Sequence, residues 1–187
     1  MTRFTITDLP LSGLKLIERQ RHGDQRGFLS RIFCSGELAL AGLQKPIVQI
    51  NHTFTAQTGT VRGLHYQRPP HAEMKLVSCI HGKVWDVAVD LRFNSPTFMH
   101  WQSQILSEDN NYALLIPEGF AHGFQTLTDD CELLYFHTEA YYPQAEVGLR
   151  YNEELLAITW PLPVSEISLR DKAHPPLGSK FNGIKIL

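Results

Sequence analysis

The sequence predicts an all-β protein, a jelly roll in which two antiparallel sheets pack face to face. Short segments that alternate apolar and polar residues recur about every ten residues, as strands of a sandwich or barrel do. Gly and Pro turns separate them, and residues 46–136 are strand and turn almost throughout. An immunoglobulin-like sandwich is the alternative, but the Cys and Trp residues lack its spacing. A chain of 187 residues with one continuous pattern predicts a single domain over residues 1–187.

Alternation and turn residues also place the individual strands. We expect strands at residues 4–7, 14–18, 28–33, 46–55, 61–67, 75–80, 83–92, 98–106, 112–116, 120–124 and 131–137. Only His81 and Gly82 separate the strand 75–80 from the strand 83–92. A two-residue connection between alternating segments is typical of a β-hairpin, so we predict that these two strands pair.

Helix is expected in a few short pieces, mainly near the C-terminus. Residues 37–43 can form one turn or two before Gly and Pro residues limit the helix. Residues 152–158 predict a second helix, because Asn152 is a suitable cap and two glutamates follow it near the positive end of the helix dipole. The tail from Pro161 is rich in Pro and polar residues and is expected to wrap the surface.

Composition excludes several classes of protein. With 17 basic and 19 acidic residues the formal charge is −2, so no basic surface for nucleic acid is indicated. The N-terminus lacks the apolar core of a signal peptide, and no apolar run approaches the roughly 18 residues of a membrane span. Cys34, Cys79 and Cys131 cannot form a closed set of disulfides. We therefore expect a cytoplasmic protein with no nucleic-acid and no membrane partner.

Polar side chains occur on strand faces that should be apolar. In the strand 61–67, His65 shares a face with Gly63, whose missing side chain would leave room for a ligand. Each polar residue alone is compatible with an ordinary solvated or hydrogen-bonded position. Inward polar groups are costly unless they are paired, so a cluster of them predicts a pocket. The cluster consists of Gln49, Asn51, His65, Lys75 and Tyr135.

These residue types suit proton transfer next to a carbonyl group. Histidine exchanges protons near neutral pH, so His65 can act as a base. Tyr135 can act as an acid or donate to a developing oxyanion, and the Lys75 ammonium can stabilise an enolate. Hydrolysis by a nucleophile is not indicated, because the sequence has no GxSxG motif and no cysteine in an evidently basic setting.

A metal site is an alternative, because jelly rolls often bind a metal through histidines. A first-row metal would need several His and carboxylate ligands to converge. The strands offer His65 and His122, but Gln67 and Lys75 stand where further ligands would be needed. Because an ammonium group beside a dication is unfavourable, we expect no metal.

The chain resembles the dTDP-4-dehydrorhamnose 3,5-epimerase family of nucleotide-sugar enzymes from about residue 14 to residue 175. The segments that carry the resemblance are 23–28, 48–52, 61–67, 75–77, 86–92, 95–98, 116–124, 141–143, 160–161 and 167–171. It implies a cupin-like jelly roll, a homodimer, a nucleotide-sugar substrate and no cofactor or metal. It further implies an isomerase of dTDP-rhamnose and O-antigen biosynthesis that epimerises a 4-keto-6-deoxyhexose at C3, C5 or both.

The resemblance also implies residue roles. His65 matches the general base and Asp171 the carboxylate that orients it. Tyr135 matches the acid on the opposite face of the sugar, Lys75 the cation beside the enolate, and Tyr141 the aromatic that stacks on the base. The remaining matches to nucleotide-sugar contacts are Arg26, Arg62, Gln49, Asn51, His122, Glu146 and Arg170. Alternation puts Arg62 and His65 on opposite strand faces, so either a bulge re-aims Arg62 or the diphosphate passes around the strand.

Two departures leave the substrate open. Arg31 stands where the family usually has a glutamate that holds thymine. A guanidinium has only donors, whereas thymine N3–H needs an acceptor and cytosine offers acceptors. The substrate is therefore dTDP-linked if Arg31 points elsewhere, or CDP-linked if it reads the base. Phe136 and His137 follow Tyr135 where the family commonly has Lys. A non-catalytic sugar-binding cupin is the remaining alternative, and the complete set of candidate catalytic residues counts against it.

Overall fold

The structure is a computed structural model that describes residues 3–178 and 180–186. These residues form thirteen strands, two single-turn α-helices and one 3₁₀ turn, which confirms an all-β protein. In chain order the elements are β1 (Phe4–Asp8), β2 (Lys15–Arg19), β3 (Arg21–Asp24), β4 (Gly27–Ser30), α1 (Ser35–Leu38), η1 (Ala39–Ala41), β5 (Gln49–Thr55), β6 (Val61–Gln67), β7 (Lys75–His81), β8 (Lys83–Asp90), β9 (Trp101–Ser107), β10 (Tyr112–Ile116), β11 (Phe120–Thr126), β12 (Cys131–His137), β13 (Glu146–Gly148) and α2 (Leu169–Lys172).

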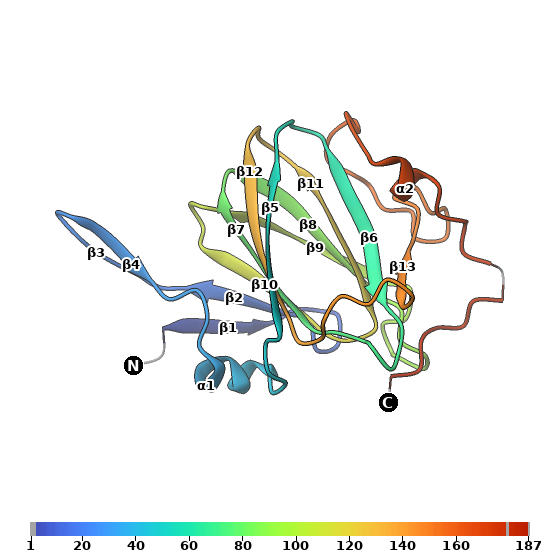
Figure 1. Ribbon diagram of the computed structural model, residues 1–187, viewed down its shortest axis with the longest axis horizontal. Helices are drawn as coiled ribbons and strands as arrows, with labels where there is room; N and C mark the ends of the chain where they lie inside the picture. The colour runs from blue at the N-terminus through green and yellow to red at the C-terminus, as the bar shows by residue number, and fades with distance from the viewer. Residues whose placement is uncertain (1–2, 179, 187) are drawn as a thin grey trace.

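Two antiparallel sheets face each other and form the body of the molecule (Figure 1). The first has the strand order β1-β2-β10-β7-β12-β5 and the second the order β13-β6-β11-β8-β9. The main core lies between them, where Val77 and Leu133 of the first sheet meet Ala88 and Phe124 of the second. Since most neighbours in each sheet are distant in sequence, this is the double-sheet jelly roll that the sequence predicted.

The predicted pairing of the strands on either side of Gly82 is wrong. β7 pairs with β10 and β12 in the first sheet, whereas β8 pairs with β9 and β11 in the second. Gly82 has φ +73°, and a Cβ there would lie 2.8 Å from Thr128 Oγ1, so the chain turns a tight corner between sheets. Cys79 before the corner and Val84 after it both point into the common core. Burial of both strands on the same core, rather than pairing between them, explains the alternating pattern.

The helix predicted at residues 37–43 lies two residues earlier. It begins at Ser35 and continues as a 3₁₀ turn that ends before Gly42, a residue with φ +97°. Leu38 and Leu43 are buried against the outer face of the first sheet. The helix is therefore held by packing rather than by its length.

The helix predicted at residues 152–158 is absent from the structure, which has turns there. The side chain of Glu153 is buried, and its two carboxylate oxygens accept the backbone N–H groups of Leu155 and Leu177. Ala157 adopts φ +47°, which no α-helix accommodates. The glutamate expected to favour the helix dipole instead ties this segment to the tail. The helix near the C-terminus is α2, which begins after the capping residue Ser168.

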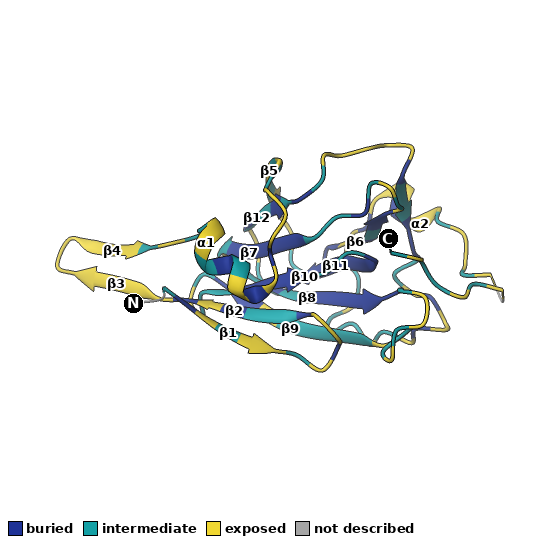
Figure 2. Ribbon diagram, turned by 90° about the horizontal axis from the view of Figure 1, so that it is seen from below, coloured by how far each residue is buried: buried dark blue, intermediate teal, exposed yellow. Residues whose placement is uncertain are grey.

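The β3–β4 hairpin projects away from both sheets, and Figure 2 shows it as exposed along its length. The strand predicted at 28–33 ends at Ser30. Phe28 and Leu29 on this hairpin are 61% and 68% exposed, which is unusual for large apolar side chains. The hairpin therefore offers apolar surface that the single chain does not cover.

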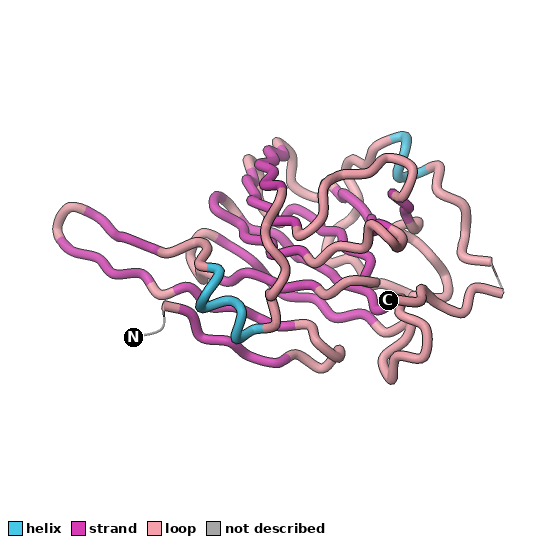
Figure 3. The backbone as a smooth tube through the Cα atoms, turned by 60° about the horizontal axis from the view of Figure 1, so that its bottom comes forward, coloured by secondary structure: helices cyan, strands magenta, loops and turns pink. Residues whose placement is uncertain are grey.

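The C-terminal tail is irregular and lies on the surface, as expected (Figure 3). Leu177, Phe181 and Ile184 anchor it by packing against the outer face of the second sheet. Within the part of the chain that the structure describes, no helix is long and apolar enough to cross a membrane.

Candidate active site

A cavity of about 430 Å³ opens between the two sheets, beyond the apolar core. Polar side chains from both sheets line it, as the alternation of inward residues predicted. The predicted site residues that line it are Gln49, Asn51, Arg62, His65, Lys75, His122, Tyr135, Tyr141, Glu146 and Arg170. Asp171 lies just behind the wall and contacts His65. The structure thus brings together every predicted site residue except Arg26 and Arg31.

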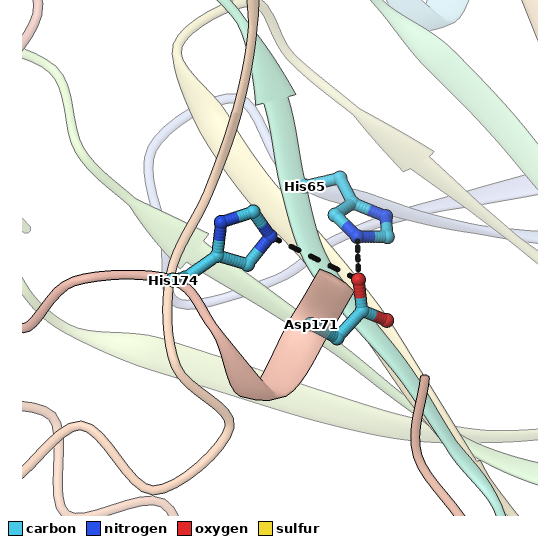
Figure 4. A group of neighbouring side chains, drawn as sticks. All are labelled: His65, Asp171 and His174. Atoms are coloured by element: carbon cyan, nitrogen blue, oxygen red, sulfur yellow. Dashed lines mark hydrogen bonds and ion pairs between the residues drawn. The ribbon is translucent and has the colours of Figure 1, made fainter. Parts of the chain in front are cut away.

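His65 and Asp171 form a hydrogen-bonded pair at one side of the cavity (Figure 4). His65 Nε2 is 2.8 Å from Asp171 Oδ1, and the N–H of Gly63 donates to Asp171 Oδ2 at 3.2 Å. Burial alone would raise the pKa of the Asp171 carboxyl, but the hydrogen bond and charge of His65, the Gly63 N–H and the Arg170 charge hold that pKa at about 2. Asp171 therefore remains an anion that fixes the imidazole, which leaves His65 Nδ1 free for a substrate.

A bulge in β6 places both Arg62 and His65 on the cavity wall. His65 pairs with His122 of β11, and Arg62 pairs with Phe124 of β11. Between these two pairs β6 therefore has one more residue than β11. A Cβ at Gly63, which has φ +115°, would lie 2.7 Å from Gly123 Cα, so only glycine permits this close approach. Of the two alternatives for Arg62, the bulge is the one that the structure shows.

Tyr135 lies on β12, in the sheet opposite His65. It pairs with Asn51 of β5 and Val77 of β7, so strands hold it on both sides. Burial, followed by the charge of Asp86, raises the pKa of the Tyr135 phenol. The hydroxyl therefore keeps its proton at neutral pH.

Lys75 does not stand alone in the cavity. Glu73 Oε1 is 3.1 Å from Lys75 Nζ, and Glu73 Oε2 is 2.7 Å from His137 Nδ1. Burial raises the pKa of Glu73, but the charge of Lys75 and the hydrogen bond and charge of His137 outweigh it, so the pKa is lowered. Glu73 was not among the predicted site residues, although its two-residue spacing from the inward Lys75 could have indicated it.

His122 is also held by a carboxylate that was not predicted. Its Nε2 is 2.9 Å from both oxygens of Asp86, and both side chains are buried. Asp86 is paired with Phe124 across β8 and β11, and the imidazole stacks edge-on to Tyr135 at 6.0 Å between ring centroids. A buried carboxyl group next to the cavity therefore fixes the His122 ring beside Tyr135.

The rim of the cavity is a connected group of polar side chains. The hydroxyl of Tyr141 donates to Glu146 Oε2 at 2.8 Å, and Arg170 Nη1 donates to the same oxygen at 2.9 Å. Gln49 accepts the backbone N–H of Tyr141 at 2.9 Å and donates to Asn51. The ring of Tyr141 is left half exposed, so a planar ligand group can stack on it.

Comparison with known proteins gives this arrangement a family. The sequence profile of dTDP-4-dehydrorhamnose 3,5-epimerase matches residues 8–179. The chain belongs to the dTDP-4-dehydrorhamnose 3,5-epimerase family. It is 39% identical over 170 residues to the epimerase of Sinorhizobium fredii, covering 90% of this chain and 87% of that one. It is 42% identical over 164 residues to the Salmonella typhimurium epimerase, covering 87% and 89%.

Solved structures of epimerases in the family share the fold. The Bacillus anthracis epimerase, with TDP and PPi bound, superposes with TM-score 0.90 at 38% identity, covering 93% of this chain and 99% of that one. The dTDP-6-deoxy-D-glucose-3,5-epimerase of Legionella pneumophila, in complex with dTDP-4-keto-L-rhamnose, superposes with TM-score 0.87 at 40% identity and 91% coverage of both chains. These likenesses confirm the resemblance, the fold and the class of enzyme, an isomerase.

Two predicted contacts of this epimerase family member lie outside the cavity. Arg26 is at the tip of the β3–β4 hairpin, where it pairs with Asp24 and is 90% exposed. Arg31 follows the hairpin and forms an ion pair with Glu37 at the start of α1. Neither guanidinium reaches the cavity of its own chain, so Arg31 gives no support to a cytidine nucleotide within one chain.

A second histidine, His174, accompanies the pair formed by His65 and Asp171 in this epimerase (Figure 4). His174 Nε2 is 3.8 Å from Asp171 Oδ1, and the ligand atoms of the three residues lie within 4.8 Å of one another. His174 was not among the possible metal ligands predicted from the sequence, which were His65 and His122. The spacing of His174 from Asp171, three residues along α2 and its end, is the signal that could have found it.

Proposed function

We propose that the chain epimerises a 4-keto-6-deoxyhexose carried on dTDP, namely dTDP-4-dehydro-6-deoxyglucose. The observation that carries this proposal is the placement of His65 with Asp171 on one side of a single cavity and Tyr135 on the opposite sheet. Inversion of a carbon needs a base on one face of the sugar and an acid on the other. The names of the relatives agree, since the Legionella pneumophila structure holds dTDP-4-keto-L-rhamnose.

The proposed reaction is redox-neutral and uses side chains only. His65 Nδ1 removes a proton from the carbon next to the keto group, and the C–H electron pair moves to the carbonyl oxygen as an enolate. Lys75 stabilises that oxyanion. Tyr135 then delivers its phenolic proton to the same carbon from the opposite face and is left as a phenolate. Exchange with water removes the proton from His65 and returns one to Tyr135, so no redox cofactor or metal is needed.

The remaining cavity residues are proposed to bind the nucleotide and orient the sugar. Arg62 and Arg170 supply positive charge for the diphosphate. Tyr141, half exposed at the rim, stacks on the base. Binding energy at these positions, far from the reacting carbon, fixes its geometry relative to the base and acid. The other proposed contacts are Gln49, Asn51, His122 and Glu146.

Solvent-deuterium exchange tests the proposed chemistry. Wild-type protein in D₂O should introduce deuterium at C3, C5 or both of a dTDP-4-keto-6-deoxy sugar, detected by NMR. His65→Asn should abolish the exchange while dTDP binding persists. His71→Asn is the matched control, because His71 is a histidine outside the proposed catalytic and binding residues. The His71→Asn protein should introduce deuterium at the wild-type rate. Wild-type exchange in the His65→Asn protein would remove His65 as the base.

We further propose that two copies assemble as a homodimer. β5 is an edge strand of the first sheet, and its outward residues Ile50 and Phe54 are 58% and 54% exposed. Phe28 and Leu29 of the projecting hairpin are also uncovered. Long apolar edge strands and apolar patches are normally covered by a partner. A second copy would also explain why Arg26, a predicted nucleotide contact, lies outside its own cavity.

The oligomeric state tests this assembly. Light scattering after gel filtration should give twice the chain mass, and the double variant Ile50→Glu with Phe54→Glu should give one chain mass. Ile105→Glu is the control, because Ile105 is a 46% exposed residue on β9, the edge of the other sheet. A wild-type monomer would contradict the proposal.

We place the enzyme in the cytoplasm, which the free thiols of Cys34, Cys79 and Cys131 support.

A further inference from the structure

His174 has a position that the proposed reaction does not use. Its Nε2 atom is buried and has no hydrogen-bond partner among the residues that the structure describes. It lies 3.8 Å from Asp171 Oδ1, the same oxygen that contacts His65 Nε2 at 2.8 Å. We propose that His65, Asp171 and His174 form a binding site for a transition-metal dication such as Zn²⁺, and that occupation of this site stops proton abstraction.

The donor set suits a borderline dication. Two imidazole nitrogens and one carboxylate oxygen make a three-ligand set typical of zinc, with bonds of about 2.0–2.2 Å. Tetrahedral bonds of that length separate ligand atoms by about 3.3 Å. The observed separations of 2.8 Å and 3.8 Å from Asp171 Oδ1 lie on either side of that value, and all three atoms lie within 4.8 Å of one another. A small movement of His174 toward the other two ligands closes the set.

The surroundings hold these ligands in place. Asp171 Oδ2 accepts the N–H of Gly63 and so leaves Oδ1 for the cation, an outer contact of the kind that orients metal-bound carboxylates. Gly148 pairs with His65 across β13 and β6, and a Cβ at Gly148 would lie 1.9 Å from His174 Nε2. The imidazole of His174 therefore occupies space that exists because residue 148 has no side chain.

One positive charge opposes the cation. Arg170 Nη2 is 3.4 Å from His65 Nε2, and Arg170 Nε is 3.6 Å from Asp171 Oδ1. The Arg170 side chain is paired with Glu146, but it is 56% exposed and can turn toward solvent when a dication enters. This repulsion limits the affinity of the site. Removal of the Arg170 charge should therefore increase the affinity of the site for the metal.

Inhibition follows from the two nitrogens of one imidazole. A cation on His65 Nε2 takes the lone pair of that nitrogen, so the single proton of the neutral ring stays on Nδ1. Nδ1 is the nitrogen that faces the substrate, and with a proton it cannot accept another. Asp171 becomes a metal ligand at the same time and no longer stabilises an imidazolium. This step rests on the proposed role of His65 as the base, whereas the binding site itself does not.

Metal binding is measured first, without substrate. Calorimetric titration of the purified full chain with Zn²⁺ should show one site per chain, and Co²⁺ should give the visible absorption of a tetrahedral ion. His174→Ala and the bulkier His174→Gln should each weaken binding at least tenfold. Arg170→Gln should strengthen it several-fold. His81→Ala is the control, since His81 pairs with Glu108 on the surface and offers a competing two-ligand site.

Three results would overturn the metal site: no Zn²⁺ binding by the wild type, Zn²⁺ affinity equal to that of the wild type in both His174 variants, or loss of Zn²⁺ binding in His81→Ala.

Deuterium exchange then tests inhibition. Zn²⁺ should suppress wild-type exchange, a chelator should restore it, and His174→Ala should exchange normally and resist Zn²⁺. Exchange that continues at saturating Zn²⁺ would overturn the inhibition. If the proposed function is wrong, no metal-free protein should introduce deuterium into the sugar, whereas the calorimetric titration with Zn²⁺ should still show the site.

Discussion

Replacement of Asp171 by Asn tests how much of the proposed catalysis depends on the carboxylate behind His65. Asp171 accepts two hydrogen bonds through separate oxygens, from His65 Nε2 on Oδ1 and from the Gly63 N–H on Oδ2. An amide has only one acceptor oxygen. Whichever way the Asn side chain turns, its NH₂ group faces one of these two donors. The substitution therefore removes a charge and leaves one donor unsatisfied.

The magnitude follows from the bond that changes during the reaction. When His65 carries the proton from the sugar, its contact with Asp171 is a charge-assisted hydrogen bond, worth about 1.5–3 kcal/mol. Loss of that stabilisation should slow exchange by about 10- to 150-fold. Loss of the His65 side chain should cost more, because the proposed base is then absent.

The assay is the initial rate of solvent-deuterium exchange into a dTDP-4-keto-6-deoxy sugar, followed by NMR. Asp109→Asn is the matched control, since Asp109 is an exposed aspartate on a turn, and it should exchange like the wild type. Thermal unfolding of each variant separates lost catalysis from lost fold. An Asp171→Asn protein that is folded and exchanges at the wild-type rate would refute the role of Asp171.

Further predictions concern the opposite wall, the buried carboxylate, the metal and the hairpin. Tyr135→Phe should retain exchange by the base while the yield of inverted product falls sharply; normal inversion would remove Tyr135 from the mechanism. The lowered pKa of Glu73 means that its carboxylate stabilises the fold above about pH 4.5 and that this contribution is lost as pH falls through the folded pKa. Glu73→Gln should therefore unfold more easily than the wild type at pH 7, and the difference should shrink in acid denaturation below about pH 4. Purified protein should hold no stoichiometric transition metal, and a chelator should not lower kcat. If the hairpin serves a partner's cavity, Arg26→Ala should raise KM for the nucleotide sugar about tenfold or more with little change in kcat, whereas an unchanged KM would exclude that role.

The inward polar residues of β5 and β7 could be predicted because side chains alternate between the two faces of a regular strand. Side chains alternate between the two faces of a strand, so Gln49 and Asn51 had to share a face, and Lys75 had to face the same side as Val77. Gln49, Asn51 and Lys75 all line the cavity. The proposed pairing of His65 with Asp171 came from family resemblance, since 106 residues separate them and no local pattern relates them.

Strand partners could not be predicted in the same way. The alternation of apolar and polar residues indicates which face of a strand is buried, but not which strand pairs with it. The pattern therefore predicted a hairpin of β7 and β8, although they lie in different sheets. The helix predicted at residues 152–158 failed for a similar reason. Its local sequence favoured a helix, but Glu153 accepts a hydrogen bond from Leu177 in the tail, a contact that no short window contains. Long-range contacts decided both cases.

The crossing at Gly82 also bears on the chemistry. If β7 and β8 paired as a hairpin, the strands that carry Lys75 and Asp86 would belong to one sheet, and one wall of a cavity would hold both. Because the chain changes sheets there, β7 stands beside β12 with Tyr135, and β8 stands beside β11, which is paired with β6 and His65. The proposed base and acid therefore approach a bound sugar from two different sheets. Inversion of a carbon needs the base and the acid on opposite faces of the sugar, since a proton removed and returned on the same face would leave the configuration unchanged.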